Sequence, residues 1–404
     1  MARNVVFAAP FPAEVTHRFV QAARDLENVR LLGLVHVAPE TRGLYHDVER
    51  VSDPLDNLAL MAGVEALARR HGPIDRVIGV LEAIQVQLAE VRARFGIPGT
   101  KPDVARVFRD KAAMKKALQA AGLPVARARL VRSLADAEAL VEGVGFPIVF
   151  KPPTGMGAKG TYRVRDRREM IEILRGLSVG PSRAVLAEEF LTGREHSLEA
   201  ITTGAQVRLT SASRYFPSCL EAVENPWIQW CCLLPRALPE PEYAEAKAIG
   251  IKAIAALGLH QGVTHMEWFR REDGRVVIGE IALRPPGANI SLMTGLAHDM
   301  SMYRAWARAE VDGAFDGPYP RNYAVGSAFL RGMGRGRVIS VRGVKEVHER
   351  IGDHVVEAKL PGLGAPKSDS YEGDGYIVLR HTDTEWVKSA LATIVDTIRV
   401  AYAG

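Results

Sequence analysis

The stretch GVTHMEWFRREDGRVVIGEIALRPPG, residues 262–287, contains two apolar runs separated by a polar turn. The runs at 262–269 and 276–281 are rich in β-branched and aromatic residues, which favour strands. Asp273-Gly274 lies between them and is a common hairpin turn. The stretch therefore predicts an antiparallel β-hairpin.

Each arm of this hairpin carries one glutamate among apolar neighbours, Glu267 on the first arm and Glu280 on the second. In an extended pair, side chains on matching faces converge, so the two carboxylates can hold one hard cation. Solvated carboxylates on exposed strands are the alternative. Because partly buried like charges need a cation or a proton to be tolerated, the pattern favours a metal site.

A lysine and a glycine-rich loop precede the hairpin in the sequence FKPPTGMGAKGT, residues 150–161. Lys151 ends a predicted strand, and Gly155, Gly157 and Gly160 follow it. Glycines let backbone N–H groups approach anionic oxygens, and a lysine supplies charge, so phosphate is the natural occupant. The loop does not match the G-x-x-x-x-G-K-[ST] P-loop, and by itself it is equally typical of an ordinary loop.

Two further segments can join this loop if the fold brings them near. Lys111 follows Asp110, which is a suitable N-terminal cap for a helix extending to residue 121. The sequence LAEEFLTGREHS, residues 186–197, places acidic residues at an edge between two predicted strands. Such an edge can accept hydrogen bonds from an adenine amine and from ribose hydroxyls, whereas a surface hairpin with solvated carboxylates is the alternative. The residues concerned are Glu188, Glu189, Phe190, Leu191 and Glu195.

The composition is that of a globular protein with two to four domains. The 404 residues are 47% hydrophobic and 25% charged, which excludes a disordered, collagen-like or coiled-coil chain. Lysine and arginine total 52 against 47 aspartate and glutamate, a net charge of +5, and the basic residues are scattered. We therefore expect anionic small molecules as partners and no nucleic acid.

The pattern of cysteines and apolar residues favours a cytoplasmic protein. Cys219, Cys231 and Cys232 suit neither a disulfide framework nor a four-ligand zinc site, which indicates a reducing compartment. The first apolar run is interrupted by two prolines, unlike a signal peptide. No window approaches the ~20 apolar residues that a bilayer span needs, so we expect no membrane partner.

The first hundred residues alternate short apolar runs, at 5–9, 30–37 and 77–81, with helical stretches. This alternation predicts a small parallel sheet covered by helices on both faces. The turn after the first run reads APFPAE and contains no glycine. The G-x-G-x-x-G fingerprint of dinucleotide-binding domains is therefore absent, which argues against a dehydrogenase.

Taken together and in this order, the motifs resemble those of the ATP-grasp superfamily. The resemblance covers roughly residues 1–400 and is most specific from 110 to 287. It implies an α/β and α+β architecture in three parts. These are an N-terminal parallel α/β domain at 1–100, an ATP-grasp domain at 101–311 with a lid subdomain at about 125–195, and a C-terminal α+β lobe at 312–404.

The resemblance implies a nucleotide site built from the residues already named. Lys111 and Lys151 would contact the phosphates of ATP, and residues 155–160 would form a flexible loop over them. Residues 188–191 would line the adenine edge, and Glu195 would bind the ribose hydroxyls.

The resemblance also implies a metal and catalytic site. Glu267 and Glu280 would hold Mg²⁺, for which Mn²⁺ can substitute, and Arg284 would stabilise charge that develops near an acyl phosphate. The family often has an asparagine two positions after the second glutamate. Here that residue is Ala282, which removes an oxygen ligand and leaves open whether one or two metal ions bind.

Three residues are candidates for contact with the acceptor substrate. His265 stands two positions before the first glutamate, although a single histidine in a hairpin is more often packed or solvated. Gly287 and Ala288 follow Arg284 and would lie beside the acyl group. The aromatic segment 214–232 is placed where the family builds its acceptor pocket, and core packing is the equal alternative.

The implied activity is ATP-dependent ligation of a carboxylate to an amine through an acyl phosphate, similar to that of bacterial L-amino-acid ligases. The partners would be small-molecule acids and amines, with a homodimer as one possible assembly. A biotin-carboxylase-like enzyme that activates bicarbonate is one alternative, although the chain has no Met-Lys-Met biotinylation sequence. A non-catalytic nucleotide-binding module is another.

Overall fold

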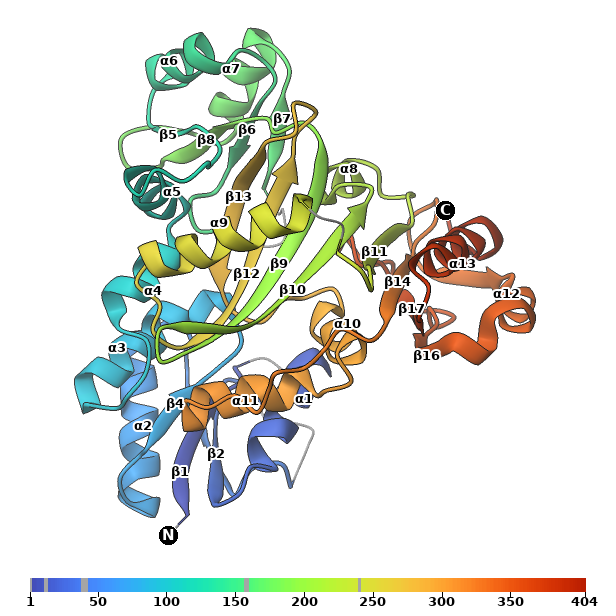
Figure 1. Cartoon of the computed structure of the whole chain (residues 1–404). Helices are drawn as coiled ribbons and strands as arrows, with labels where there is room; N and C mark the ends of the chain where they lie inside the picture. The colour runs from blue at the N-terminus through green and yellow to red at the C-terminus, as the bar shows by residue number, and fades with distance from the viewer. Residues whose placement is uncertain (1, 11–13, 38–42, 156–159, 239–240) are drawn as a thin grey trace.

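The computed structural model describes residues 2–10, 14–37, 43–155, 160–238 and 241–404. Figure 1 shows three lobes around a long antiparallel sheet: the N-terminal domain below, an arm with α6 and α7 above, and the C-terminal helices α12 and α13 to one side. Within the described residues, no helix has both the length and the apolar character that crossing a bilayer requires.

The N-terminal domain contains the predicted parallel sheet, with strand order β3-β2-β1-β4. Alternate residues of β1 enter two different cores, Val5 and Phe7 on one face and Val6 and Ala8 on the other. Both faces are therefore buried, which is why the apolar runs are nearly continuous. The elements are β1 (Arg3–Ala8), α1 (Glu14–Arg24), β2 (Val29–Val35), β3 (Asp47–Arg50), α2 (Asn57–His71), β4 (Arg76–Ile78), the 3₁₀ helix η1 (Glu82–Ile84) and α3 (Gln85–Phe95).

A second sheet of four antiparallel strands, in the order β5-β8-β6-β7, forms the upper arm of Figure 1. Two amphipathic helices, α6 and α7, pack against it and bury residues such as Leu140 and Met170. The elements are β5 (Ala128–Val131), α6 (Leu134–Val144), β6 (Ile148–Lys151), β7 (Tyr162–Val164), α7 (Arg167–Gly176) and β8 (Val185–Glu189). Lys151 is the last residue of β6, as the sequence predicts.

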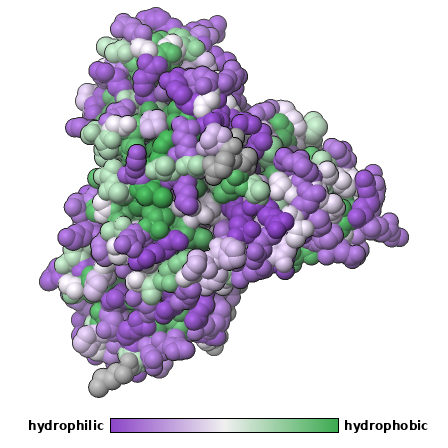
Figure 2. Space-filling view, viewed as in Figure 1, coloured by the Kyte–Doolittle hydropathy of each residue, from purple (hydrophilic) through white to green (hydrophobic). Residues whose placement is uncertain are grey.

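The central sheet has eight antiparallel strands in the order β13-β12-β9-β10-β11-β14-β17-β16. It includes the predicted hairpin, whose strands β12 and β13 pair in antiparallel register. Helix α9 crosses one face of the sheet, and Figure 2 shows hydrophobic side chains gathered in this middle part of the molecule. The elements are β9 (Arg194–Thr203), β10 (Gln206–Phe216), α8 (Cys219–Glu224), β11 (Trp230–Leu234), α9 (Glu242–Ala256), β12 (Gly262–Arg270) and β13 (Val276–Leu283).

The C-terminal residues continue the same sheet, since β14, β17 and β16 follow β11 in its strand order. A single sheet thus extends to both sides of residue 312, and the division of the chain at that position stays a prediction. The elements are α10 (Ile290–Ala297), α11 (Met302–Asp312), β14 (Ala324–Leu330), β15 (Val338–Arg342), α12 (Val344–Ile351), the 3₁₀ helix η2 (Gly352–His354), β16 (Val355–Lys359), β17 (Gly375–His381), α13 (Thr384–Thr397) and β18 (Arg399–Tyr402).

An aromatic contact and a helix cap position the elements that surround the site. The N-terminal domain is held by α11, because Trp306 packs in tilted and edge-on geometry against Phe7 and Phe19. Helix α4 (Pro102–Arg109) is followed directly by α5 (Lys111–Ala120), and Asp110 caps α5 by accepting from the backbone N–H groups of Ala112 and Ala113. The predicted cap thereby places Lys111 at the first turn of α5.

Candidate active site

A cavity of about 790 Å³ lies between the upper arm, the central hairpin and the N-terminal domain. Its walls contain most of the residues that the sequence singles out. Lining it are Lys111, Lys151, Gly155, Glu188, Glu189, Phe190, Leu191, Glu195, His265, Glu267, Glu280, Arg284, Gly287 and Ala288. Gly160 is exposed and is not among the lining residues, and Gly157 lies outside the described residues.

The two hairpin glutamates lie directly opposite each other, because Glu267 on β12 is the register partner of Glu280 on β13. The expected convergence of the two residues is therefore confirmed. Glu280 accepts from the ammonium of Lys111 at 2.5 Å, and its second oxygen lies 3.5 Å from Nζ of Lys151. Burial raises the pKa of Glu280, but the two lysines outweigh burial and hold the pKa at about 2.

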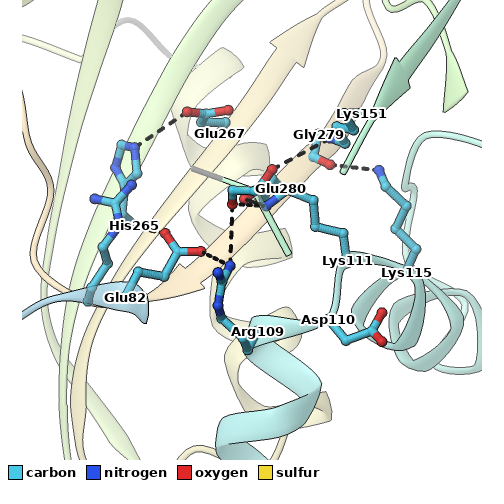
Figure 3. A network of polar contacts seen from close by, with 12 residues as sticks. Glu82, Arg109, Asp110, Lys111, Lys115, Lys151, His265, Glu267, Gly279 and Glu280 are labelled. Carbon is cyan, nitrogen blue, oxygen red and sulfur yellow. Dashed lines mark hydrogen bonds and ion pairs between the residues drawn. The ribbon is translucent and has the colours of Figure 1, made fainter. Parts of the chain in front are cut away.

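Figure 3 shows Lys111, Lys115 and Lys151 near Glu280. The three lysines form ion pairs with Glu280 and with the buried Glu188. Lys151 lies 2.9 Å from one oxygen of Glu188, and Lys115 lies 3.2 Å from the other. Lys115 is buried and also donates to the carbonyl oxygen of Gly279 at 2.7 Å. Burial lowers the pKa of Lys115 to about 8. Three ammonium groups thus gather beside the cavity, and a cluster of cations of this kind suits an anionic ligand.

The beginning of the glycine-rich loop is tied to this cluster. The carbonyl oxygen of Gly155 accepts from the ammonium of Lys111 at 3.1 Å and from Arg109 at 3.3 Å. Gly160, at the far side of the loop, has a φ of 70°, the left-handed region that glycine adopts without strain. On the two sides of the loop, Gly155 and Thr161 both line the cavity.

The segment after β8 presents a mixed apolar and polar edge to the cavity. Glu189 accepts from the backbone N–H of Arg127 at 2.8 Å, which ties the edge to β5. The guanidinium carbon of Arg163 lies 4.5 Å from the centroid of the Phe190 ring. Leu191 is buried. An apolar slot beside a strand edge is suited to a flat aromatic base.

Glu195, at the start of β9, is buried and accepts from the backbone N–H of Cys219 at 2.8 Å. Burial raises its pKa to about 8, and the nearby carboxylate of Glu267 acts in the same direction. Around neutral pH this carboxyl group is therefore largely protonated, so it can donate as well as accept a hydrogen bond.

Arg284 follows β13 and reaches the N-terminal domain. Its Nε donates to Glu82 at 2.9 Å, and a terminal nitrogen donates to the carbonyl oxygen of Pro285 at 3.1 Å. The other oxygen of Glu82 accepts from Arg109 at 3.0 Å (Figure 3). Glu82 is buried and so holds two arginines at the cavity wall. The sequence analysis missed Glu82; its signal was its place just after a predicted parallel strand, where such sheets bind ligands.

His265 is buried between two carboxylates. Its Nδ1 lies 2.9 Å from Glu199 and its Nε2 lies 3.7 Å from Glu267. Burial lowers the pKa of His265, but hydrogen bonds to the two carboxylates outweigh it and raise the pKa to about 9. Glu199 escaped the sequence analysis, because its contact with His265 depends on the pairing of β9 with β12.

The acceptor end of the cavity, named for the residues predicted to contact the acceptor, combines residues from distant parts of the chain. Ala288 is buried and Gly287 lies beside it, and Tyr371 from the C-terminal part faces the same space. Of the aromatic segment 214–232, Tyr215 lines the cavity, whereas Trp230 is buried in the core. The segment therefore contributes to the core and to the cavity wall, and its role in an acceptor pocket stays a prediction.

The residues present fit a magnesium ion whose coordination shell is completed by oxygen atoms of a bound substrate. Among the described residues, no three histidine, cysteine, aspartate or glutamate side chains gather as a metal-ligand group. Glu267 and Glu280 supply two hard oxygen donors side by side, and Ala282 supplies none. Mg²⁺ is commonly held by one or two carboxylates together with phosphate oxygens and water, which matches this pair.

Comparison with known proteins agrees with this geometry. Residues 116–295 match the ATP-grasp domain family. An L-arginine-specific L-amino acid ligase from Bacillus subtilis is 26% identical over 261 residues, which cover 63% of this chain and 62% of that protein. The chain thus spans less than two thirds of that relative's length.

Solved structures show the same fold over the whole chain. An L-amino acid ligase from Bacillus licheniformis superposes with a TM-score of 0.81 at 19% identity and covers 100% of this chain and 99% of that one. An N5-carboxyaminoimidazole synthetase from Staphylococcus aureus in complex with ADP gives a TM-score of 0.74 at 18% identity, with 97% of each chain covered. The resemblance inferred from the sequence is confirmed: residues 116–295 match the ATP-grasp domain family, and the chain has the ATP-grasp fold.

Proposed function

We propose that the protein is an ATP-dependent ligase that joins a carboxylate to an amine through an acyl phosphate and releases ADP and phosphate. The observation that carries this proposal is the arrangement of Lys111, Lys151, Glu267, Glu280 and Arg284 on one cavity of an ATP-grasp domain. Cations and metal-binding carboxylates in this arrangement can neutralise a phosphoryl group during transfer, which is where phosphoryl transfer needs stabilisation.

In this proposal the lysine cluster binds the phosphates of ATP. Lys111 and Lys151 are paired with Glu280, and each can turn its ammonium toward phosphate oxygens. Glu267 and Glu280 would then be the protein ligands of Mg²⁺ or of Mn²⁺. A metal ion held there would supply charge neutralisation for the phosphate groups. Lys115 is fully buried, so its role is to keep Glu188 and the carbonyl oxygen of Gly279 in place.

The nucleoside would occupy the edge after β8. Phe190 and Leu191 offer an apolar slot for adenine, and the backbone edge there offers hydrogen bonds. Glu195 would bind the ribose hydroxyls. Its side chain is fixed by the backbone N–H of Cys219, so its orientation is set before the nucleotide arrives.

The reaction would proceed in two steps. An oxygen of the substrate carboxylate attacks the γ-phosphorus of ATP, the bond to the β-phosphate oxygen breaks, and ADP leaves. The neutral amine then attacks the acyl carbon, phosphate leaves with the bonding electron pair, and the amine proton passes to solvent. Arg284 would stabilise negative charge on the acyl phosphate and on the tetrahedral species, because its planar fork can contact two oxygens at once.

The acid is proposed to be an amino acid or a similar small acid. The name of the Bacillus subtilis relative and the fold shared with an L-amino acid ligase support this substrate class. The expected three-part division, at 1–100, 101–311 and 312–404, is proposed with it, since the cavity lies between residues of all three parts.

ADP release tests the proposal. The purified protein is assayed with ATP and Mg²⁺, first with single amino acids and hydroxylamine, and then with pairs of amino acids. We expect ADP and phosphate only when a carboxylate is present, and a hydroxamate when hydroxylamine is the amine. Release of AMP and pyrophosphate would contradict an acyl phosphate, and ADP release that depends on bicarbonate and free biotin would favour the biotin-carboxylase-like alternative.

A further inference from the structure

The acceptor end of the cavity contains a carboxylate without a cation partner. Glu372 lies between β16 and β17 and lines the cavity next to Tyr371 and Ala288. No lysine, arginine or histidine within the described part of the chain forms an ion pair with it. In contrast, Glu82 and Glu280 of the same cavity are each paired with a basic side chain.

The position of this carboxylate is fixed by its surroundings. The backbone N–H of Ala288 favours the charged form of the Glu372 carboxyl and so lowers its pKa, and the backbone N–H of Glu372 donates to Oγ of Ser370 at 3.2 Å. The preceding Tyr371 packs edge-on against Trp230, with ring centroids 5.1 Å apart. The turn is thus anchored to the core, and Glu372 is held ready for a ligand rather than moving freely in solvent.

The backbone beside Glu372, at residues 287–289, adopts a conformation that is unusual for residues other than glycine. Ala288 has a φ of 51° and Asn289 a φ of 59°, both in the left-handed region that disfavours residues other than glycine. A β-carbon on Gly287 would lie 3.5 Å from Oε1 of Glu372, so the backbone here passes close to the carboxylate. Strain of this kind persists where the surrounding structure requires it and is common at ligand sites.

The electrostatics of this end of the cavity favour a cation. Burial raises the pKa of Glu372, and the N–H of Ala288 and the charge of Arg284 only partly offset burial. Phe19 and Ile290 add apolar walls nearby. A partly buried carboxylate among apolar groups is stabilised by an ammonium group that donates hydrogen bonds to it.

We propose that Glu372 binds the ammonium group of an amino-acid substrate, on the same side of the cavity as Arg284. This inference rests on the proposed ligase activity and names its substrate class. A zwitterionic amino acid carries an anionic and a cationic group on adjacent carbons, and the cavity offers Arg284 and Glu372 at one end to receive them. Bicarbonate and simple carboxylic acids have no ammonium group that Glu372 could bind.

The test compares amino acids with acids of the same skeleton that lack the amino group. The pairs are L-alanine and propionate, L-leucine and 4-methylpentanoate, and L-arginine and 5-guanidinopentanoate. ADP release is measured with hydroxylamine as the amine for the wild type, Glu372→Gln and the control Glu385→Gln, which changes an exposed carboxylate on α13. Glu372→Gln should lower kcat/KM for the amino acids about 10- to 100-fold and leave the des-amino acids within about twofold. The control should match the wild type.

A second arm identifies which substrate carries the ammonium. Hydroxylamine is replaced by an amino acid as the amine, at a saturating concentration of the acid. A loss that appears only in this arm assigns Glu372 to the amine substrate, and a loss with hydroxylamine assigns it to the acid. Equal losses for amino acids and des-amino acids, or no loss in either arm, would overturn the inference.

Binding measurements separate this inference from the proposed function. Titration calorimetry with the same three pairs is performed in the presence of Mg²⁺ and a non-hydrolysable ATP analogue. If no acid stimulates ADP release but the wild type binds amino acids and Glu372→Gln does not, the ligase proposal fails and the ammonium site stands. If acids stimulate ADP release and both proteins bind amino acids equally, the ligase proposal stands and the ammonium site is wrong.

Discussion

Arg284 and Glu82 form an ion pair at 2.9 Å that joins the end of the central hairpin to the N-terminal domain. The two residues are 202 positions apart in the sequence. The pair fixes the guanidinium at the acceptor end of the cavity, where a substrate carboxylate would be activated.

Arg284→Lys should therefore lower kcat more than it changes KM for ATP. A lysine keeps the positive charge but cannot contact two oxygens in the geometry of a guanidinium. Loss of one such donor typically costs about 10²–10³ in kcat. Steady-state kinetics with ATP and the best acid as variable substrates gives the comparison. A loss confined to KM for ATP would instead place Arg284 on the nucleotide in the ground state.

Glu280→Gln should abolish turnover. Glu267→Gln should lower turnover severely, but less than Glu280→Gln does. Among the described residues, Glu280 forms ion pairs with two lysines and Glu267 forms one with His265, so Glu280 lies closer to the proposed phosphate site. Both variants should need more Mg²⁺ for half-maximal ADP release, because each removes one oxygen ligand. Turnover at the wild-type rate under limiting Mg²⁺ in either variant would show that the metal assignment is wrong.

A comparison of Lys151→Ala with Lys115→Met should separate an effect on ATP binding from an effect on folding stability. Lys151 faces the cavity, and its loss still leaves Glu188 paired with Lys115, so we expect weak ATP binding and a modest fall in Tm. Lys115 is fully buried, and its loss leaves the carbonyl oxygen of Gly279 without its donor. Breaking a buried pair typically costs about 3–5 kcal/mol, so Lys115→Met should lower Tm more.

Thermal unfolding with and without ATP provides the measurement for both lysine variants. Bound ATP should raise the Tm of Lys115→Met, if that protein folds, and should not raise the Tm of Lys151→Ala. An undiminished ATP-induced rise in Lys151→Ala would remove Lys151 from the phosphate site.

The hairpin and its two glutamates could be predicted from the sequence because a hairpin is a local structure. The turn at Asp273-Gly274 and the flanking apolar runs determine which residues face each other, and the register follows. The cap at Asp110 was predictable for the same reason. Lys111 and Lys151, in contrast, could be joined to the hairpin only through the family resemblance.

The partners of the site residues could not be predicted, because they come from distant segments. Glu82 and Glu372 reach the cavity through the packing of the N-terminal domain and the turn before β17. Glu199 contacts His265 through the pairing of β9 with β12. The addition of the C-terminal strands to the central sheet is likewise non-local. Alternation of apolar residues indicates which face of a strand is buried but not which strand lies next to it.

Glu195→Gln should change the dependence of stability on pH. The pKa of Glu195 is about 8 in the folded protein, against 4.5 for an ordinary glutamate. Below pH 4.5 both the folded and the unfolded chain carry the proton, so the full contribution of this group to stability is present. As pH rises through 8 that contribution is lost, because only the unfolded chain ionises without cost.

The measurement for Glu195 is the Tm of wild type and variant between pH 4.5 and pH 8.5 without nucleotide. Glutamine cannot ionise, so the Tm of Glu195→Gln minus that of the wild type should increase across this range. A constant difference would mean that Glu195 ionises normally in the folded protein.

The most direct test of the account follows the oxygen atoms of the acid. The carboxylate that gives the most ADP release is labelled with ¹⁸O and turned over with ATP, Mg²⁺ and an amine, and the inorganic phosphate is analysed by mass spectrometry. An acyl phosphate formed by attack on the γ-phosphorus leaves one ¹⁸O atom in each molecule of phosphate, and we expect that result. Unlabelled phosphate, or ¹⁸O recovered in AMP, would contradict the proposed ligase mechanism.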